Sequence, residues 1–142
     1  MKDAYTNVFY DAVRETQAVT GYELPHSIEA YVVMLLANYV DRPDFLPEKS
    51  FAEAYYNLSK TSDAKTLGDC CLFITGVFPR YGHRKGLQKS YYSRIGISSY
   101  ETVSGYTQSD IFSTLACHFD FVSDFISEVT HSSKGVQNNL FR

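Results

Sequence analysis

Apolar residues recur along most of the chain with the three-to-four-residue spacing of amphipathic helices, and no stretch alternates as a strand does. In the first segment, Ala4, Val8, Ala12 and Thr16 share one helical face, and Gly21 follows its end. A short polar tail from about residue 132 is expected to be a last helical turn or a frayed end. The pattern predicts about six helices, over residues 3–19, 25–40, 50–59, 62–78, 88–103 and 107–129.

Local signals at helix ends support several of these boundaries. Ser50 and Glu53 have the spacing of a capping box at the start of the third helix. Ser62 and Asp63 are predicted to cap the fourth helix, which should end before Pro79. The apolar run inside this fourth segment would also suit a strand, but its polar, capped start favours a helix.

Two of the predicted helices contain segments that are apolar nearly all round. Residues 31–37 are predicted to form a central helix, and residues 70–74 should be buried on most sides. Gly96 and Ser99 are poor helix formers within the fifth helix, which predicts close approach of another helix or a local bend. Because no glycine- or proline-rich linker and no internal repeat divides the chain, the sequence predicts an all-α, single-domain, irregular bundle of about six helices.

Length and composition agree with one globular domain over residues 1–142. The length is close to the commonest domain size, and 44% hydrophobic with 20% charged residues argues against disorder. Aromatic content is the unusual value, because twelve tyrosines and ten phenylalanines make up 15% of the chain. A buried tyrosine must find a partner for its hydroxyl, so we expect a core with many polar tips, together with a pocket or an interface.

The compartment follows from what the sequence lacks. Residues 1–5 do not begin a signal peptide, and the longest apolar run, residues 31–40, is interrupted by Asn38 and too short to span a bilayer. Three cysteines make an odd count, and adjacent Cys70 and Cys71 are awkward for a structural disulfide. We therefore expect reduced, buried thiols in a cytoplasmic protein that makes no membrane contact.

A charge asymmetry is the most informative feature for function. Residues 70–100 contain no Asp or Glu and carry a charge of +5, although the whole chain carries −3. Such a surface could hold an anion or an acidic partner, or its cations could pair with the acidic remainder of the chain or simply face solvent. The candidate binding residues are the cations of this window, its histidine and the tyrosines among them: Arg80, Tyr81, His83, Arg84, Lys85, Lys89, Tyr91, Tyr92 and Arg94.

The overall charge of the chain disfavours some classes of binding partner and favours others. A sequence pI of about 5.7 disfavours general nucleic-acid binding, which is typical of strongly basic domains. A small anionic ligand or an acidic protein surface fits this window better. A second copy of the chain is a further candidate partner, because apolar helix faces could form a homodimer.

Two stripes of side chains have alternative interpretations. Tyr92, Gly96 and Tyr100 would share one helical face, where a neighbouring helix or a flat ligand could lie, and helix packing is the favoured interpretation. A second stripe on the sixth predicted helix repeats a carboxylate every four residues and needs opposing positive charge or solvent. The basic window is its obvious internal partner, unless the stripe is an acidic binding face, and its members are Asp120, Asp124 and Glu128.

Metal binding is not predicted. Glu128 and His131 have the Glu-x-x-His spacing of di-iron helical bundles, and His26 with Glu29 gives the reverse order. A real site of that kind needs two such motifs and two further glutamates on facing helices. Here the second motif is inverted and both lie near predicted helix ends, so chance spacing is favoured.

Nucleophilic catalysis has no better support. Cys117, His118 and Asp120 are suitable residue types, but neighbouring positions on a helix point in different directions and cannot form a hydrogen-bonded dyad. The chain contains no Cys-x-x-Cys, P-loop, Gly-x-Ser-x-Gly or dinucleotide-binding pattern. We therefore assign no catalytic residue and no cofactor, and an enzyme is the less favoured class.

Several spaced motifs between residues 24 and 131 can be compared with a known pattern: Gly68-Asp69, Leu72-Phe73, Gly76, Tyr91-Tyr92, Gly96 and Ser99-Tyr100. With this order and similar spacing, the chain resembles a family of small, uncharacterised bacterial all-helical proteins. The resemblance implies a helical cytoplasmic protein of bacterial type. It implies no activity, no cofactor and no catalytic residue.

Three functions remain open at this level. The leading hypothesis is a non-enzymatic binding or adaptor protein that uses the basic, tyrosine-rich surface of residues 80–94. The rival is a sensor or enzyme for a small anion or nucleotide-like ligand, held between helices by Arg84, Tyr91 and Arg94. The third is a homodimeric scaffold domain in which the basic window is only solvated.

Overall fold

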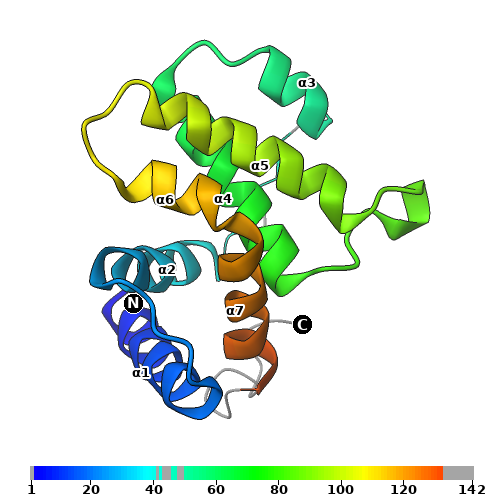
Figure 1. Ribbon diagram of the computed structural model, residues 1–142. Helices are drawn as coiled ribbons and strands as arrows, with labels where there is room; N and C mark the ends of the chain where they lie inside the picture. Colours follow the sequence, from blue (N-terminus) through cyan, green and yellow to red (C-terminus); the bar gives the residue numbers. More distant parts are fainter. Residues whose placement is uncertain (1, 41, 43–45, 48–49, 133–142) are drawn as a thin grey trace.

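The computed structural model describes residues 2–40, 42, 46–47 and 50–132, and this part of the chain contains seven α-helices and no strand (Figure 1). The predicted all-α fold is confirmed, and the predicted tail beyond residue 132 lies outside the described residues. The helices are α1 (Lys2–Thr20), α2 (His26–Tyr39), α3 (Phe51–Tyr56), α4 (Thr61–Val77), α5 (Lys89–Ser104), α6 (Ile111–Cys117) and α7 (Phe119–Ser132), with a 3₁₀ turn at His83–Lys85.

Two helix ends form as their sequences predict. Gly21 adopts a left-handed φ of 77° after α1, and its N–H donates to the Gln17 carbonyl over 2.9 Å. Ser50 Oγ accepts a hydrogen bond from the Glu53 N–H over 3.2 Å and so caps α3. Both contacts satisfy backbone groups that a helix end leaves unpaired, which is why short-range sequence signals locate them.

The start of α4 differs from the prediction. The helix begins directly after Lys60, so Ser62 and Asp63 lie inside its first turn and no side chain caps it. The prediction that these two residues cap the helix is wrong, although Asp63 still places negative charge near the positive end of the helix dipole. The other end agrees with the prediction, because α4 stops at Val77, before Pro79.

The single helix predicted over residues 107–129 is two helices, α6 and α7, which run in different directions (Figure 1). The break falls at His118, whose φ of −114° and ψ of 27° are not helical. The His118 N–H still donates to Thr114, and its carbonyl accepts from Val122, both over 2.9 Å. The apolar period continues across the break, so periodicity alone could not locate it.

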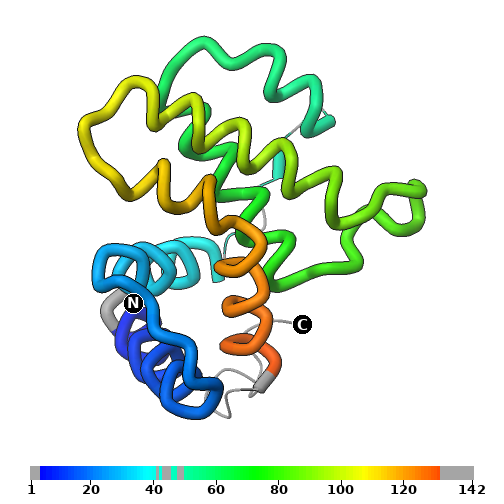
Figure 2. Tube along the Cα trace, in the orientation of Figure 1, coloured from blue at the N-terminus to red at the C-terminus, as the bar shows by residue number. Residues whose placement is uncertain are grey.

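Helix α4 is the central helix of the fold. Every residue from Leu67 to Val77 is buried, with α5 packed along it and α7 packed against it. The prediction of a central helix at residues 31–37 is wrong, because α2 packs mainly against α1 and leaves Met34 47% exposed. Figure 2 shows the α1–α2 hairpin set to one side of α3, α4 and α5, with α7 extending beside it.

Glycines allow these helices to approach closely. A Cβ on Gly96 of α5 would lie 2.6 Å from ring carbons of Phe119 at the start of α7. One on Gly76 of α4 would lie 2.5 Å from the Ile126 Cγ2 of α7. Real Cβ atoms do not make such contacts, so a larger residue would push the helices apart. The close approach predicted at Gly96 is confirmed.

Candidate functional site

Residues 80–86, which connect α4 to α5, form a tight segment that we call the basic turn. Gly82 and Gly86 have φ values of 88° and 75°, a left-handed conformation that favours glycine. The Gly82 carbonyl accepts hydrogen bonds from the N–H of Lys85 over 2.9 Å and of Leu87 over 3.0 Å. Because the backbone closes on itself in this way, the turn presents its side chains from a fixed frame.

The basic turn rests on a group of rings that we call the tyrosine cluster: Phe51, Tyr81, Tyr91 and Tyr92. The Tyr92 ring lies at the centre, with ring centroids 4.9 Å from Phe51, 4.9 Å from Tyr91 and 5.5 Å from Tyr81. These edge-to-face contacts are the geometry that aromatic rings prefer. A Cβ on Gly82 would collide with the Tyr92 hydroxyl, so the turn sits directly on the cluster.

The nine residues predicted as a binding surface fall into three groups. Tyr92 is 2% exposed and belongs to the core, as the packing interpretation of its helical face predicts, so it is not part of an exposed surface. Tyr81, Lys89 and Tyr91 are half-buried. The remaining five are exposed: Arg80, His83, Arg84, Lys85 and Arg94.

One of the five cations is paired within the chain. Lys89 Nζ lies 2.9 Å from Asp124 Oδ1 of α7, so internal pairing with the predicted acidic stripe occurs at this position. In the part of the chain that the structure describes, no carboxylate pairs with the other four cations, which are Arg80, Arg84, Lys85 and Arg94. Most of the positive charge in this window is therefore available to solvent or to a partner.

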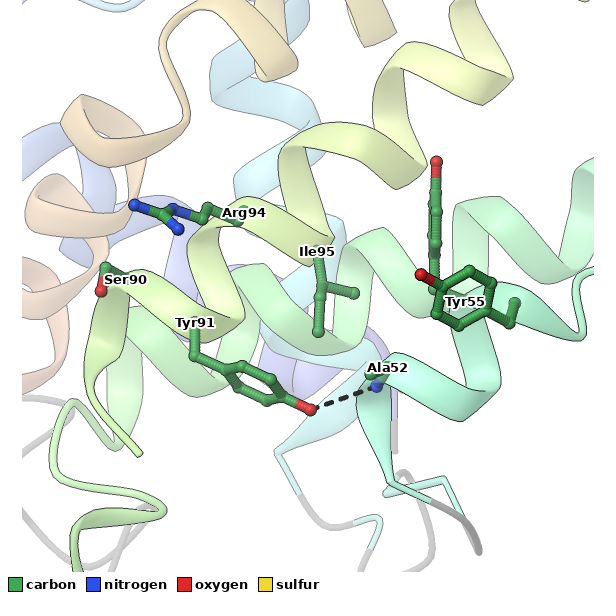
Figure 3. Close-up of a pocket in the computed structure, with 7 residues that line it drawn as sticks. Ala52, Tyr55, Ser90, Tyr91, Arg94 and Ile95 are labelled. Carbon is green, nitrogen blue, oxygen red and sulfur yellow. Dashed lines mark hydrogen bonds between the residues drawn. The ribbon is translucent and has the colours of Figure 1, made fainter. Parts of the chain in front are cut away.

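A groove of about 370 Å³ lies beside the tyrosine cluster, between α3 and α5 (Figure 3). Its surface is mostly apolar and aromatic, and none of the lining residues that the structure describes is acidic. The lining residues, which together we call the α3–α5 groove, are Ala52, Tyr55, Tyr56, Ser90, Tyr91, Arg94 and Ile95.

The two walls of the α3–α5 groove are joined at one end. The Ala52 N–H of α3 donates to Tyr91 Oη of α5 over 3.2 Å, while Ile95 and Tyr55 lie farther along (Figure 3). The guanidinium of Arg94 points away from Tyr55 and the Tyr91 hydroxyl (Figure 3). Arg84 does not line the groove, so the predicted convergence of Arg84, Tyr91 and Arg94 on one pocket does not form there.

A cluster of polar side chains, which the sequence did not predict, surrounds Asp69 of α4 in the core. Asp69 is 4% exposed. Its Oδ1 accepts hydrogen bonds from Tyr31 Oη over 2.5 Å and from Tyr100 Oη over 2.7 Å, and its Oδ2 lies 2.9 Å from Lys65 Nζ. This network, which we call the Asp69 network, ties α2, α4 and α5 together.

The Asp69 network keeps its neighbours protonated. Burial, and then the negative charge of Asp69, raise the pKa of Tyr31 and the pKa of Tyr100 well above the usual 10.0. The same two causes raise the pKa of the Cys70 thiol from 9.0 to about 12, and burial raises that of Cys71. A protonated, buried thiol is a poor nucleophile, so these groups are suited to holding the core rather than to catalysis.

The sequence contained one signal for this network. Asp69 is an acidic residue beside an otherwise apolar run, four positions after Lys65, which is the spacing of a helical ion pair. A buried charge requires partners. Its other partners lie 38 and 31 residues away in the chain, and periodicity could not identify them.

Other candidate groups do not add a second site. Cys117 and His118 are exposed at the break between α6 and α7, and Asp120 is exposed on α7. Among the described residues, no three His, Cys, Asp or Glu side chains are grouped so that they could hold a metal ion. No helix in the described ranges has both the length and the apolar character needed to cross a membrane.

Comparison with family models, with characterised proteins and with solved structures finds no match to this chain. The resemblance to a bacterial family therefore stays a prediction. The small, all-helical fold rests on the structure itself. The basic turn, the α3–α5 groove and the Asp69 network are the features of the structure that bear on function.

Proposed function

We propose that this protein is a non-enzymatic binding protein whose basic turn, together with Arg94, contacts an acidic protein surface. One observation carries the proposal: four exposed cations have no carboxylate partner in the described part of the chain, and three of them stand on a rigid turn. Water solvates such charges at little cost, and an acidic partner can still reach them.

The rigidity of the basic turn favours binding. Ordering a flexible loop on association lowers affinity, and a turn already closed by two left-handed glycines and seated on the tyrosine cluster avoids most of that loss. Arginine and tyrosine are also the residue types enriched where protein interfaces contribute most energy. Exposed charges on such a surface mainly accelerate association and select partners by sign.

A small-anion sensor receives less support from the geometry. Such a pocket needs cationic side chains that converge on one point. Arg94 lines the α3–α5 groove but directs its guanidinium away from Tyr55 and the Tyr91 hydroxyl, and Arg84 does not line the groove (Figure 3). An extended acidic surface can contact cations that diverge, so it fits this arrangement better.

The first experiment measures binding of a fluorescently labelled oligoglutamate peptide by anisotropy. Because the whole chain carries −3, a glutamate peptide is repelled by the molecule in general and can be attracted only locally. We expect binding at low salt that weakens as salt rises, and a loss of about tenfold or more in affinity for Arg84→Glu.

Lys60→Glu is the matched control, because it makes the same change of charge on an exposed residue in another part of the chain. Its affinity should stay within about twofold of the wild type, and both variants should unfold within about 0.5 kcal/mol of it. Equal weakening by the two variants, or binding of inorganic phosphate or ATP in place of the peptide, would count against the proposal.

A further inference from the structure

We infer that the α3–α5 groove receives an aromatic side chain of the acidic partner, so that the partner is an acidic segment with an apolar anchor. This inference rests on the proposed function, and it adds to the acidic character of the partner an aromatic side chain that fits the groove. The groove and the basic turn would then form one continuous binding surface.

The chemistry of the groove selects an apolar anchor. Its lining is mostly apolar and aromatic, and Arg94, the one charged residue among its described lining residues, directs its guanidinium away from Tyr55 and the Tyr91 hydroxyl (Figure 3). A volume of about 370 Å³ is near the small end of ligand sites, and it suits one large side chain better than an extended cofactor. Protein interfaces commonly place a single aromatic anchor in a pocket of this kind.

The position of the groove selects an acidic segment to carry that anchor. Ser90, Tyr91 and Arg94 are on the first turns of α5, directly after the basic turn. Tyr91 lines the groove and also packs on Tyr92, which supports the basic turn through Tyr81. A segment seated in the groove therefore passes Arg94 and the cations of the basic turn and, among the described lining residues, no carboxylate, which is complementary to negative charge.

The groove is formed before any partner binds. Phe51 at the start of α3 is buried against Tyr92, and the Ala52 N–H donates to the Tyr91 hydroxyl, so α3 is held against α5 at this end. Tyr56, by contrast, is 86% exposed at the edge of the groove. A partner that covers this ring removes apolar surface from water without first having to open the groove.

The test uses two labelled acidic peptides that differ only in a central Phe or Ala. For the wild-type protein we expect the Phe peptide to bind about tenfold more tightly than the Ala peptide. Ser90→Trp fills the groove and should bring this ratio close to one. Ser62→Trp is the matched control, because Ser62 and Ser90 are both exposed and both occupy the second position of their helices.

A second pair of variants guards against misfolding. Tyr56→Ala should lower the Phe-to-Ala ratio, and Tyr106→Ala, which removes a tyrosine that is also mostly exposed, should leave it unchanged. Thermal unfolding of all four variants checks that each is folded. A ratio that survives Ser90→Trp and Tyr56→Ala in folded protein overturns the inference.

The remaining outcomes separate this inference from the proposed function. If both peptides bind equally and Arg84→Glu weakens both, the acidic partner stands and the anchor is wrong. If the Phe peptide binds in the groove regardless of Arg84→Glu, the groove is real and the acidic partner is wrong. A dimer in light scattering that Ser90→Trp dissociates would assign the groove to a second copy of the chain and overturn both.

Discussion

Asp69 and Arg84 are both charged, but their surroundings differ in every respect. Asp69 is 4% exposed, and Tyr31, Tyr100 and Lys65 all donate to it. Arg84 is exposed on the basic turn, and no described carboxylate pairs with it. In the core, each partner replaces a lost water, whereas on the turn water itself solvates the charge.

This difference separates stability from binding in the molecule. In the Asp69 network, three side chains of the chain itself occupy the carboxylate oxygens of Asp69. No carboxylate in the described ranges pairs with Arg80, Arg84 or Lys85 of the basic turn, so a partner can use these charges, and the stability of the turn depends on its backbone and on the rings beneath it. Mutations in the two regions should therefore affect different measurements.

Removing the buried carboxylate is the largest change we expect. Asp69→Ala should lower the free energy of unfolding by about 3 kcal/mol, because the buried Tyr100 hydroxyl and the partly buried Tyr31 hydroxyl lose their acceptor. Asp124→Ala, which removes an exposed carboxylate paired with Lys89, should lower it by less than about 1 kcal/mol. Urea unfolding followed by circular dichroism measures both, and equal losses would show that burial of Asp69 does not matter.

Replacing the two left-handed glycines of the basic turn with alanine should have the next largest effect on stability. Gly82→Ala should lower the free energy of unfolding by about 2 kcal/mol, because it combines an unfavourable φ of 88° with a collision against Tyr92. Gly86→Ala has a similar φ of 75° but no neighbour within 4 Å, so about 1 kcal/mol is expected. Thermal melts compare the two, and a smaller effect at Gly82 would mean that the turn is not seated on the tyrosine cluster.

Raising the pH into the alkaline range should lower the free energy of unfolding gradually. The folded protein holds the protons of Tyr31, Tyr100 and Cys70 at pH values where the unfolded chain releases them. These three groups should therefore leave the free energy of unfolding unchanged below about pH 8, lower it as unfolded cysteine titrates near about 8.5, and lower it faster above about 10 as unfolded tyrosine titrates.

The limiting slope is about 1.4 kcal/mol per pH unit for each proton. Tyr31→Phe removes one of these protons, so its stability should fall less steeply than that of the wild type above about pH 10. Urea midpoints across this range provide the measurement. A wild-type midpoint that does not change as the pH rises past 10 would contradict the hydrogen bonds of Tyr31 and Tyr100 to Asp69.

Interactions between near neighbours could be predicted well. Helix periodicity located most of the helices, Ser50 caps α3 through the Glu53 N–H, and Gly96 marks a close helix contact. Periodicity failed at His118, because the buried face continues from α6 into α7 while the direction changes. Periodicity also predicted a central position for α2, whereas α4 is central, since an apolar segment does not reveal how many neighbours surround it.

For the candidate site, the sequence predicted the basic window but not the contacts that it makes with distant segments. The basic window is visible as a run without carboxylates, and within the described residues four of its five cations have no carboxylate partner. Which cation is paired depends on α7, which brings Asp124 to Lys89 from 35 residues away. The α3–α5 groove likewise requires two helices whose relative placement no local pattern encodes.

The sequence by itself therefore determined the helical class, most helix ends and the excess of positive charge in one window. These properties depend on contacts within a few residues or on composition. Only the tertiary structure decided that Tyr92 is buried, that Asp69 gathers Tyr31 and Tyr100, and that a groove opens beside the basic turn. Those features arise where distant segments meet, and packing of the whole core selects which segments do so.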